Sequence, residues 1–232
     1  MEKCYNNIAS KVCPRYPRPR KFSDPGGDFS DEELNDLIRK QDNALTEADL
    51  MCIFQGALPA GDYQEVMYFL PAALQHIAVN KEVGTADHLL HWISCNKEKL
   101  QSDGCYNDLL NFFEQLFAHL TAESVLEKDY LKDDSLCDTI IDCLNEYFDL
   151  YGDFLLQKYL LPIENYVQAA WLLYFLEHHY MRLSRTKSNF LEMAAYNNAL
   201  RQKVYDLILE EALKDENTLL FWDKTLQNCG IV

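Results

Sequence analysis

Three groups of polar side chains have types and spacings that could do chemistry, and the first is Asp87-His88-x-x-His91. Two histidines three residues apart face the same side of a helix, as two ligands of one zinc ion must. Catalytic zinc also needs a third ligand and a general base, and the sequence has no H-E-x-x-H motif. We therefore expect no metal here, and keep a zinc site at Asp87, His88 and His91 as an alternative.

The second group is Asp133-Asp134-x-x-x-Asp138. It resembles the aspartate-rich magnesium site of the all-helical isoprenoid synthases, where carboxylates on one helix hold Mg²⁺ against a diphosphate. The resemblance covers six residues, and its spacing departs from the usual DDxxD of that family. It also implies a second acidic motif and basic residues for the diphosphate, neither of which is recognisable in this sequence. A metal-dependent all-helical enzyme is thus the alternative function.

The third group is a line of carboxylates within residues 133–153, which we predict to form one helix. At 100° per residue the acidic side chains share about 120° of arc, opposite a broad apolar face. No Lys or Arg occurs between residues 133 and 157. The candidate partner-binding residues are Asp134, Asp138, Asp142, Glu146, Asp149 and Asp153.

This acidic line has a local electrostatic cost. Each like-charge pair at i, i+4 destabilises an isolated helix by roughly 0.2–0.5 kcal/mol. A helix that only needs to be soluble would normally interleave Lys or Arg among its acids. Two interpretations remain open: the line docks a basic partner, or it is a solvated face paired with cations from elsewhere in the fold.

The charge distribution restricts the partner. The formal net charge is −16, yet residues 1–22 carry six basic side chains and only one acidic one. The remaining residues therefore form an acidic body that repels nucleic acid and anionic membranes and attracts basic proteins. The eight cysteines include no C-x-x-C pair. Without an apolar leader or a membrane-length apolar run, we expect reduced cysteines and a cytoplasmic protein.

The chain divides by composition into two parts. Residues 1–29 form a basic, proline-rich arm, either a disordered terminus or a clasp on a partner or on the acidic body. Residues 30–232 form a single acidic helical domain. Capping boxes begin its first helices at Ser30, Thr46 and Asp62, each with an acid three residues later. Pro71 must kink or divide the helix after Leu70.

These patterns predict an all-α fold of eight or nine antiparallel helices. The arrangement is either a helical-hairpin array of the HEAT or TPR kind or an irregular bundle. The sequence favours a non-enzymatic binding protein, with no catalytic residue and no cofactor, that engages a basic partner through the acidic helix. A bacterial immunity or inhibitor protein that neutralises a cationic toxin fits this chemistry.

Overall fold

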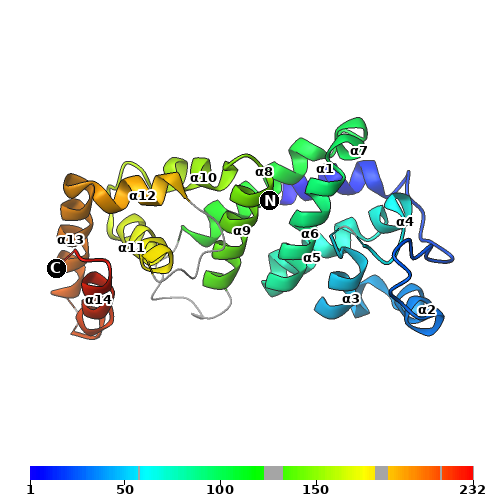
Figure 1. Ribbon diagram of the computed structural model, residues 1–232, viewed down its shortest axis with the longest axis horizontal. Coiled ribbons are helices and arrows are strands. Elements are labelled where there is room, and N and C mark those ends of the chain that lie inside the picture. The colour runs from blue at the N-terminus through cyan, green and yellow to red at the C-terminus, as the bar shows by residue number, and fades with distance from the viewer. Residues whose placement is uncertain (57, 123–132, 181–187, 215, 232) are drawn as a thin grey trace. The chain divides into compact units, whose positions relative to one another are not determined.

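The computed structural model describes residues 1–56, 58–122, 133–180, 188–214 and 216–231, and all of the regular secondary structure in these ranges is helical. Within these ranges there are fourteen α-helices, one 3₁₀ turn and no strand, which confirms the all-α prediction. The chain forms two compact units, Met1–Leu116 and Phe117–Val232 (Figure 1). This boundary between the two units differs from the boundary after residue 29 that the sequence composition indicates.

The first unit contains seven helices, the 3₁₀ turn η1 and the start of α8. Their bounds are α1 Glu2–Val12, α2 Asp31–Arg39, η1 Asp42–Ala44, α3 Glu47–Ile53, α4 Tyr63–Met67, α5 Leu70–Asn80, α6 Val83–Cys95, α7 Lys97–Ser102 and α8 Tyr106–Leu120. Helix α5 packs against α1 and α6, and α6 packs against α3. The buried side chains along these helices form the core of the first unit.

The three predicted capping boxes are present at the starts of α2, α3 and α4. Ser30, Thr46 and Asp62 each accept a hydrogen bond from the third backbone N–H of their helix, and the acid at that position bonds back. A cap of this kind contributes about 1 kcal/mol. Pro71 lies in the first turn of α5, where its missing N–H costs nothing. The division comes at Tyr68–Phe69, slightly before the predicted position.

The N-terminal segment is part of the first unit. Residues 2–12 form α1, which buries Cys4, Ile8 and Val12. Lys11 Nζ lies 2.6 Å from the Asp108 carboxylate, and Arg15 Nη1 lies 2.6 Å from that of Asp103. The N-terminal segment therefore contacts acidic residues of its own unit.

The second unit contains the end of α8 and six further helices. These are α9 Asp133–Tyr147, α10 Tyr151–Leu160, α11 Tyr166–Tyr180, α12 Asn189–Tyr196, α13 Asn198–Ala212 and α14 Glu216–Asn228. Helix α11 packs against α10, α12, α13 and α14 (Figure 1). Residues 169–176 of α11 are all buried, so this helix is apolar around its whole circumference.

More helices are described than the eight or nine predicted, because several predicted helices are divided. The breaks between α4 and α5, α6 and α7, α9 and α10, and α12 and α13 account for most of the difference. Among the described residues, no helix combines the length and apolar content that crossing a bilayer requires.

Candidate functional site

The helix predicted over residues 133–153 is two helices joined by a tight turn. Helix α9 ends at Tyr147, and α10 begins at Tyr151. Between them, Asp149 (φ 53°) and Leu150 (φ 62°) both have left-handed backbone conformations. Such conformations end an α-helix and are uncommon for a residue as bulky as Leu. The prediction of one continuous acidic helix is therefore wrong. We call residues 138–154 the α9–α10 corner.

Asp153 is buried, which corrects its predicted place on the acidic surface. Its backbone N–H donates to Asn145 Oδ1 at 2.8 Å, and Asn145 Nδ2 donates to Asp153 Oδ1 at 3.1 Å. Ser188 Oγ donates to the same carboxylate at 2.6 Å, and the Phe190 N–H donates at 3.2 Å. These bonds, here called the Asp153 lock, tie the α9–α10 corner to the start of α12, where negative charge is favourable.

Gly152 completes this packing. A Cβ added at residue 152 would lie 2.5 Å from both Asn145 Oδ1 and the Ile141 carbonyl oxygen. The Ile141 oxygen belongs to the backbone and cannot move aside cheaply. The corner thus requires a glycine at this position and a buried carboxylate beside it. The sequence pattern did not reveal this requirement, because the helical periodicity continues through the turn.

Asp138 remains partly exposed and faces α11. The Tyr174 hydroxyl donates to Asp138 Oδ2 at 2.6 Å, and His178 Nδ1 lies 2.7 Å from the same oxygen. The Tyr174 and His178 rings are in contact, with centroids 4.2 Å apart. The sequence pattern did not indicate that Asp138 and His178 lie together.

The other acids of the corner differ in exposure. Asp142 is half-buried, whereas Glu146 and Asp149 are exposed. Within the described residues neither Glu146 nor Asp149 forms an ion pair, and the nearest Lys in sequence beyond them is Lys158. The side chain of Asp134 lies outside the described residues. Four of the six predicted acids, Asp138, Asp142, Glu146 and Asp149, therefore follow α9 and its C-terminal turn.

Exposed apolar side chains lie beside these acids. Leu150 is 38% exposed and Phe154 is 48% exposed. The Tyr151 and Phe154 rings stack with centroids 5.3 Å apart, and Lys158 Nζ lies 5.6 Å from the Phe154 ring. On one continuous helix, Leu150 and Tyr151 would lie on the apolar face opposite the acids. Only the turn at residues 148–150 brings Leu150 to the surface.

The candidate metal clusters gain no support. Among the described residues, no group of three or more His, Cys, Asp or Glu side chains is placed to hold a metal ion. His88 and His91 are both half-buried on α6, and the His91 ring lies against Gly56. The side chains of Asp133 and Asp134 lie outside the described residues, so the magnesium alternative at 133–138 has no described geometry.

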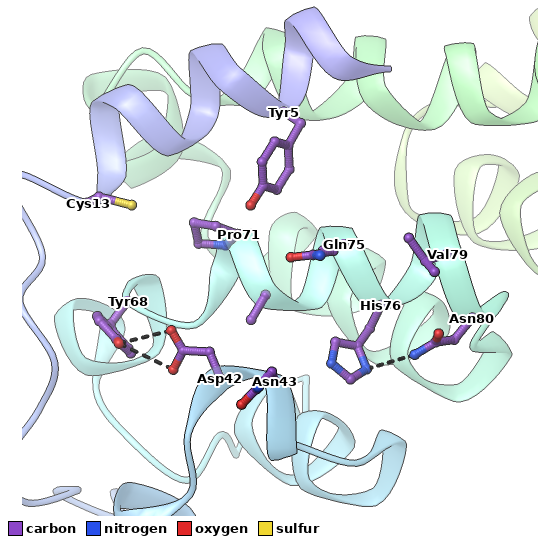
Figure 2. Close-up of a pocket in the computed structure, with 11 residues that line it drawn as sticks. Tyr5, Cys13, Asp42, Asn43, Tyr68, Pro71, Gln75, His76, Val79 and Asn80 are labelled. Atoms are coloured by element: carbon purple, nitrogen blue, oxygen red, sulfur yellow. Dashed lines mark hydrogen bonds between the residues drawn. The ribbon is translucent and has the colours of Figure 1, made fainter.

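The first unit contains a cavity of about 490 Å³ between α1, η1 and α5. Figure 2 shows Tyr5 of α1 pointing toward Pro71 and Gln75 of α5, with Asp42 and Asn43 of η1 on the opposite side. The Tyr68 hydroxyl donates to Asp42 Oδ2 at 3.0 Å, and Arg18 Nη1 lies 3.2 Å from Asp42 Oδ1. These bonds tie η1 to the α4–α5 junction and to the N-terminal segment and leave the carboxylate at the cavity edge.

His76 lines the same cavity and is oriented by Glu82. His76 Nδ1 lies 2.9 Å from Glu82 Oε1, and Thr85 Oγ1 donates to Glu82 Oε2 at 2.9 Å. Burial opposes ionisation of Glu82, but hydrogen bonds from His76, Asn80 and Thr85 outweigh it and lower the pKa of the Glu82 carboxyl. Because an ionised carboxylate only accepts hydrogen bonds, His76 Nδ1 donates to it, and the ring orientation is fixed.

A second carboxylate of the first unit is fully engaged. The Asp103 cluster consists of Asp103, Arg15, Tyr16 and Tyr63. The hydroxyls of Tyr16 and Tyr63 donate to Asp103 Oδ2 at 2.5 and 2.7 Å, and Arg15 Nη1 lies 2.6 Å from Oδ1. Burial opposes ionisation, but these donors and the Arg15 charge outweigh it and lower the pKa of Asp103. This cluster holds the N-terminal segment against α4 and the turn after α7.

Comparison with known proteins gives no relatives: no protein-family model matches the chain, and no curated protein or solved structure is detectably similar to it.

Proposed function

We propose that this protein is a non-enzymatic binding protein that engages a basic partner through the α9–α10 corner. The contact residues are Asp138, Asp142, Glu146 and Asp149, with Leu150 and Phe154 as apolar anchors beside them. The hydrogen bonds of the Asp153 lock stabilise the α9–α10 corner, and Asp153 itself does not contact the partner. The proposal thus keeps the acidic surface expected from the sequence, with a shorter carboxylate line and an apolar component.

One observation carries this proposal: exposed acids and exposed apolar side chains meet at the same turn. Glu146 and Asp149 are exposed, and Leu150 and Phe154 are 38% and 48% exposed. Interfaces gain most of their affinity from a few large apolar side chains, while surrounding charges set the association rate and the choice of partner. Both components are present within nine residues of sequence, from 146 to 154.

The absence of Lys and Arg from the sequence between 133 and 157 supports a basic partner in this proposal. Charges on a partner that complement this surface accelerate association, and the effect weakens with salt. A partner with Lys or Arg around an apolar patch fits both components of the corner. A cationic toxin neutralised by this chain is one role of that kind. No described geometry favours the zinc or magnesium alternatives.

The experiment is an affinity pull-down in which the unaltered chain and two charge-reversed variants serve as bait. Glu146→Lys/Asp149→Lys removes the exposed acids of the corner. Asp206→Lys/Glu210→Lys makes the same change in charge on exposed residues of α13. Proteins retained by the unaltered chain are identified by mass spectrometry, and circular dichroism checks that both variants keep their helical content.

The proposal predicts a basic partner that is retained by the unaltered chain and by the α13 variant and is lost from the corner variant. Retention of every captured protein by the corner variant would refute the α9–α10 corner as the docking surface. An acidic partner, or equal loss from both variants, would refute the charge argument.

A further inference from the structure

The first turn of α10 carries a pair of aromatic rings whose chemistry narrows the kind of partner. The Tyr151 and Phe154 rings are nearly parallel, with an interplanar angle of 25° and centroids 5.3 Å apart. Phe154 is 48% exposed, and no other Phe among the described residues is exposed. We propose that this pair receives an arginine side chain of the basic partner, whose guanidinium stacks on the Phe154 ring and pairs with the acids of the corner. This inference rests on the proposed function and specifies which basic residue the α9–α10 corner selects.

The Phe154 ring already has a cation beside it. Lys158 Nζ lies 5.6 Å from the centroid of the Phe154 ring and 5.4 Å from that of the Tyr159 ring. A cation within about 6 Å of an aromatic centroid is attracted by the negative face of the ring. Lys158 therefore marks a position where positive charge is favourable. Because the Tyr159 ring is as near as that of Phe154, Lys158 keeps an aromatic contact when an incoming guanidinium takes its place at Phe154.

The surroundings of the Phe154 ring favour Arg over Lys. A guanidinium is planar and weakly hydrated, so it stacks on an aromatic face while its N–H groups point sideways to carboxylates. Asp149 is exposed five residues before Phe154, and Glu146 is exposed in the last turn of α9. An ammonium group is compact and strongly hydrated, so it gains less from a ring and a carboxylate at the same time. The aromatic pair beside exposed acids thus distinguishes two side chains of equal charge.

The backbone beneath the aromatic pair is held in place. The Tyr151 N–H donates to the Phe148 carbonyl oxygen at 3.1 Å. The Asp153 N–H donates to the Leu150 carbonyl oxygen at 3.1 Å, and the Asp153 lock ties this turn to the start of α12. Because the turn that carries both rings is fixed before the partner arrives, binding loses little conformational entropy at this position.

The test uses two labelled peptides of equal charge, one with three Arg residues separated by Gly and the other with three Lys residues separated by Gly. Fluorescence polarisation measures the dissociation constant of each peptide for the full chain. The Arg peptide should bind at least about fivefold more tightly than the Lys peptide at low salt. Phe154→Leu keeps an apolar side chain but removes the ring, so this ratio should fall below about twofold. The matched control is Tyr196→Leu on α12, at a site 84% exposed, and it should leave the ratio unchanged.

A second variant tests the cation already present at the ring. Lys158→Met keeps a long side chain and removes the ammonium group that competes for Phe154, so the Arg peptide should bind about two- to threefold more tightly. Lys203→Met makes the same change in charge on an exposed residue of α13 and should have a smaller effect. Equal effects of the two variants, or weaker binding to Lys158→Met, would contradict the position assigned to the guanidinium.

Different outcomes would overturn the docking surface and the preference for arginine. If neither peptide binds, or if Glu146→Lys/Asp149→Lys leaves both affinities unchanged, the proposed function is contradicted and the arginine site with it. If both peptides bind through these acids with equal affinity, the corner attracts positive charge without selecting Arg, and only the arginine site is overturned. A preference for the Arg peptide that persists in Phe154→Leu, or that Tyr196→Leu also abolishes, would show that the aromatic pair is not its source.

Discussion

The Asp103 cluster of the first unit and the α9–α10 corner of the second use acidic side chains in opposite ways. Arg15 and two tyrosine hydroxyls surround Asp103, and Lys11 pairs with Asp108 nearby. At the corner, Glu146 and Asp149 are exposed, and the sequence supplies no Lys or Arg between 133 and 157. The paired acids Asp103 and Asp108 stabilise the fold of the first unit. The acids of the corner are left on the surface, which is why we propose that they bind the partner.

The corner itself contains both kinds of acid. Asp153 is buried under hydrogen bonds from Asn145, Ser188 and the Phe190 N–H, while Asp149 lies four residues before it and is exposed. The two residues have the same chemistry and a helical spacing in the sequence. Their roles differ because the turn at 149–150 directs one inward and the other outward. Variants at these positions distinguish acids that stabilise the fold from acids that we propose to bind the partner.

The largest expected effect comes from Asp153→Ala. The change leaves the Asn145 amide, the Ser188 hydroxyl and the Phe190 N–H without their buried acceptor. Each unpaired buried group costs about 1–3 kcal/mol, so we expect the free energy of unfolding to fall by about 3 kcal/mol or more. Urea denaturation measures it. Glu146→Ala is the matched control and should change stability by under about 0.5 kcal/mol. Equal losses of stability in Asp153→Ala and Glu146→Ala would contradict the distinction between the buried and the exposed acids of the corner.

The next effect is that of Gly152→Ala. The added methyl group meets the Ile141 carbonyl oxygen and Asn145 Oδ1 at 2.5 Å, so the corner must distort. Overpacking of this kind costs about 1–3 kcal/mol. Gln157→Ala on the exposed side of α10 controls for the change to Ala. If urea denaturation finds Gly152→Ala as stable as the unaltered chain, the packing described for the Asp153 lock is incorrect.

A smaller, pH-dependent effect is expected at the Asp103 cluster. The folded pKa of Asp103 is lowered below its unfolded value of about 3.9, so its contribution is present above pH ~4 and is lost as pH falls through the folded pKa. Tyr16→Phe/Tyr63→Phe removes two donors and brings the folded pKa back toward its usual value. Between pH 5 and 3 the variant should therefore lose less stability than the unaltered chain.

Urea denaturation at the two pH values measures this difference. Tyr5→Phe, which removes a hydroxyl far from Asp103, serves as the control. A larger acid-induced loss in the double variant than in the unaltered chain would be opposite in sign to this expectation and would refute the role of the tyrosine hydroxyls.

The smallest effect on stability is expected from Glu146→Lys/Asp149→Lys. Glu146 forms a like-charge i, i+4 pair with Asp142, so removing it stabilises α9 by a few tenths of a kcal/mol at most. The free energy of unfolding should stay within about 0.5 kcal/mol of that of the unaltered chain. A loss above about 1 kcal/mol in urea denaturation would show that these acids are structural, like Asp103 and Asp153.

Local signals in the sequence predicted the helix starts well. The capping boxes at Ser30, Thr46 and Asp62 and the break near Pro71 depend only on residues within a few positions of each other. The turn at 149–150 depends instead on Asp153 meeting Ser188, which lies 35 residues later. Periodicity cannot detect such a contact, so the pattern of residues 133–153 predicts one helix. The acidic character of α9 was predicted, but the buried position of Asp153 and the exposure of Leu150 were not.

The most direct test of the central claim is the association rate of the chain with its basic partner at low salt, about 50 mM, and at high salt, about 300 mM. Complementary charges raise this rate, and salt screens them. We predict that the rate constant of the unaltered chain falls roughly tenfold or more over this range. The rate constant of Glu146→Lys/Asp149→Lys should be low and nearly independent of salt. A salt-independent rate for the unaltered chain, or the same salt dependence in the variant, would contradict binding through the acids of the α9–α10 corner.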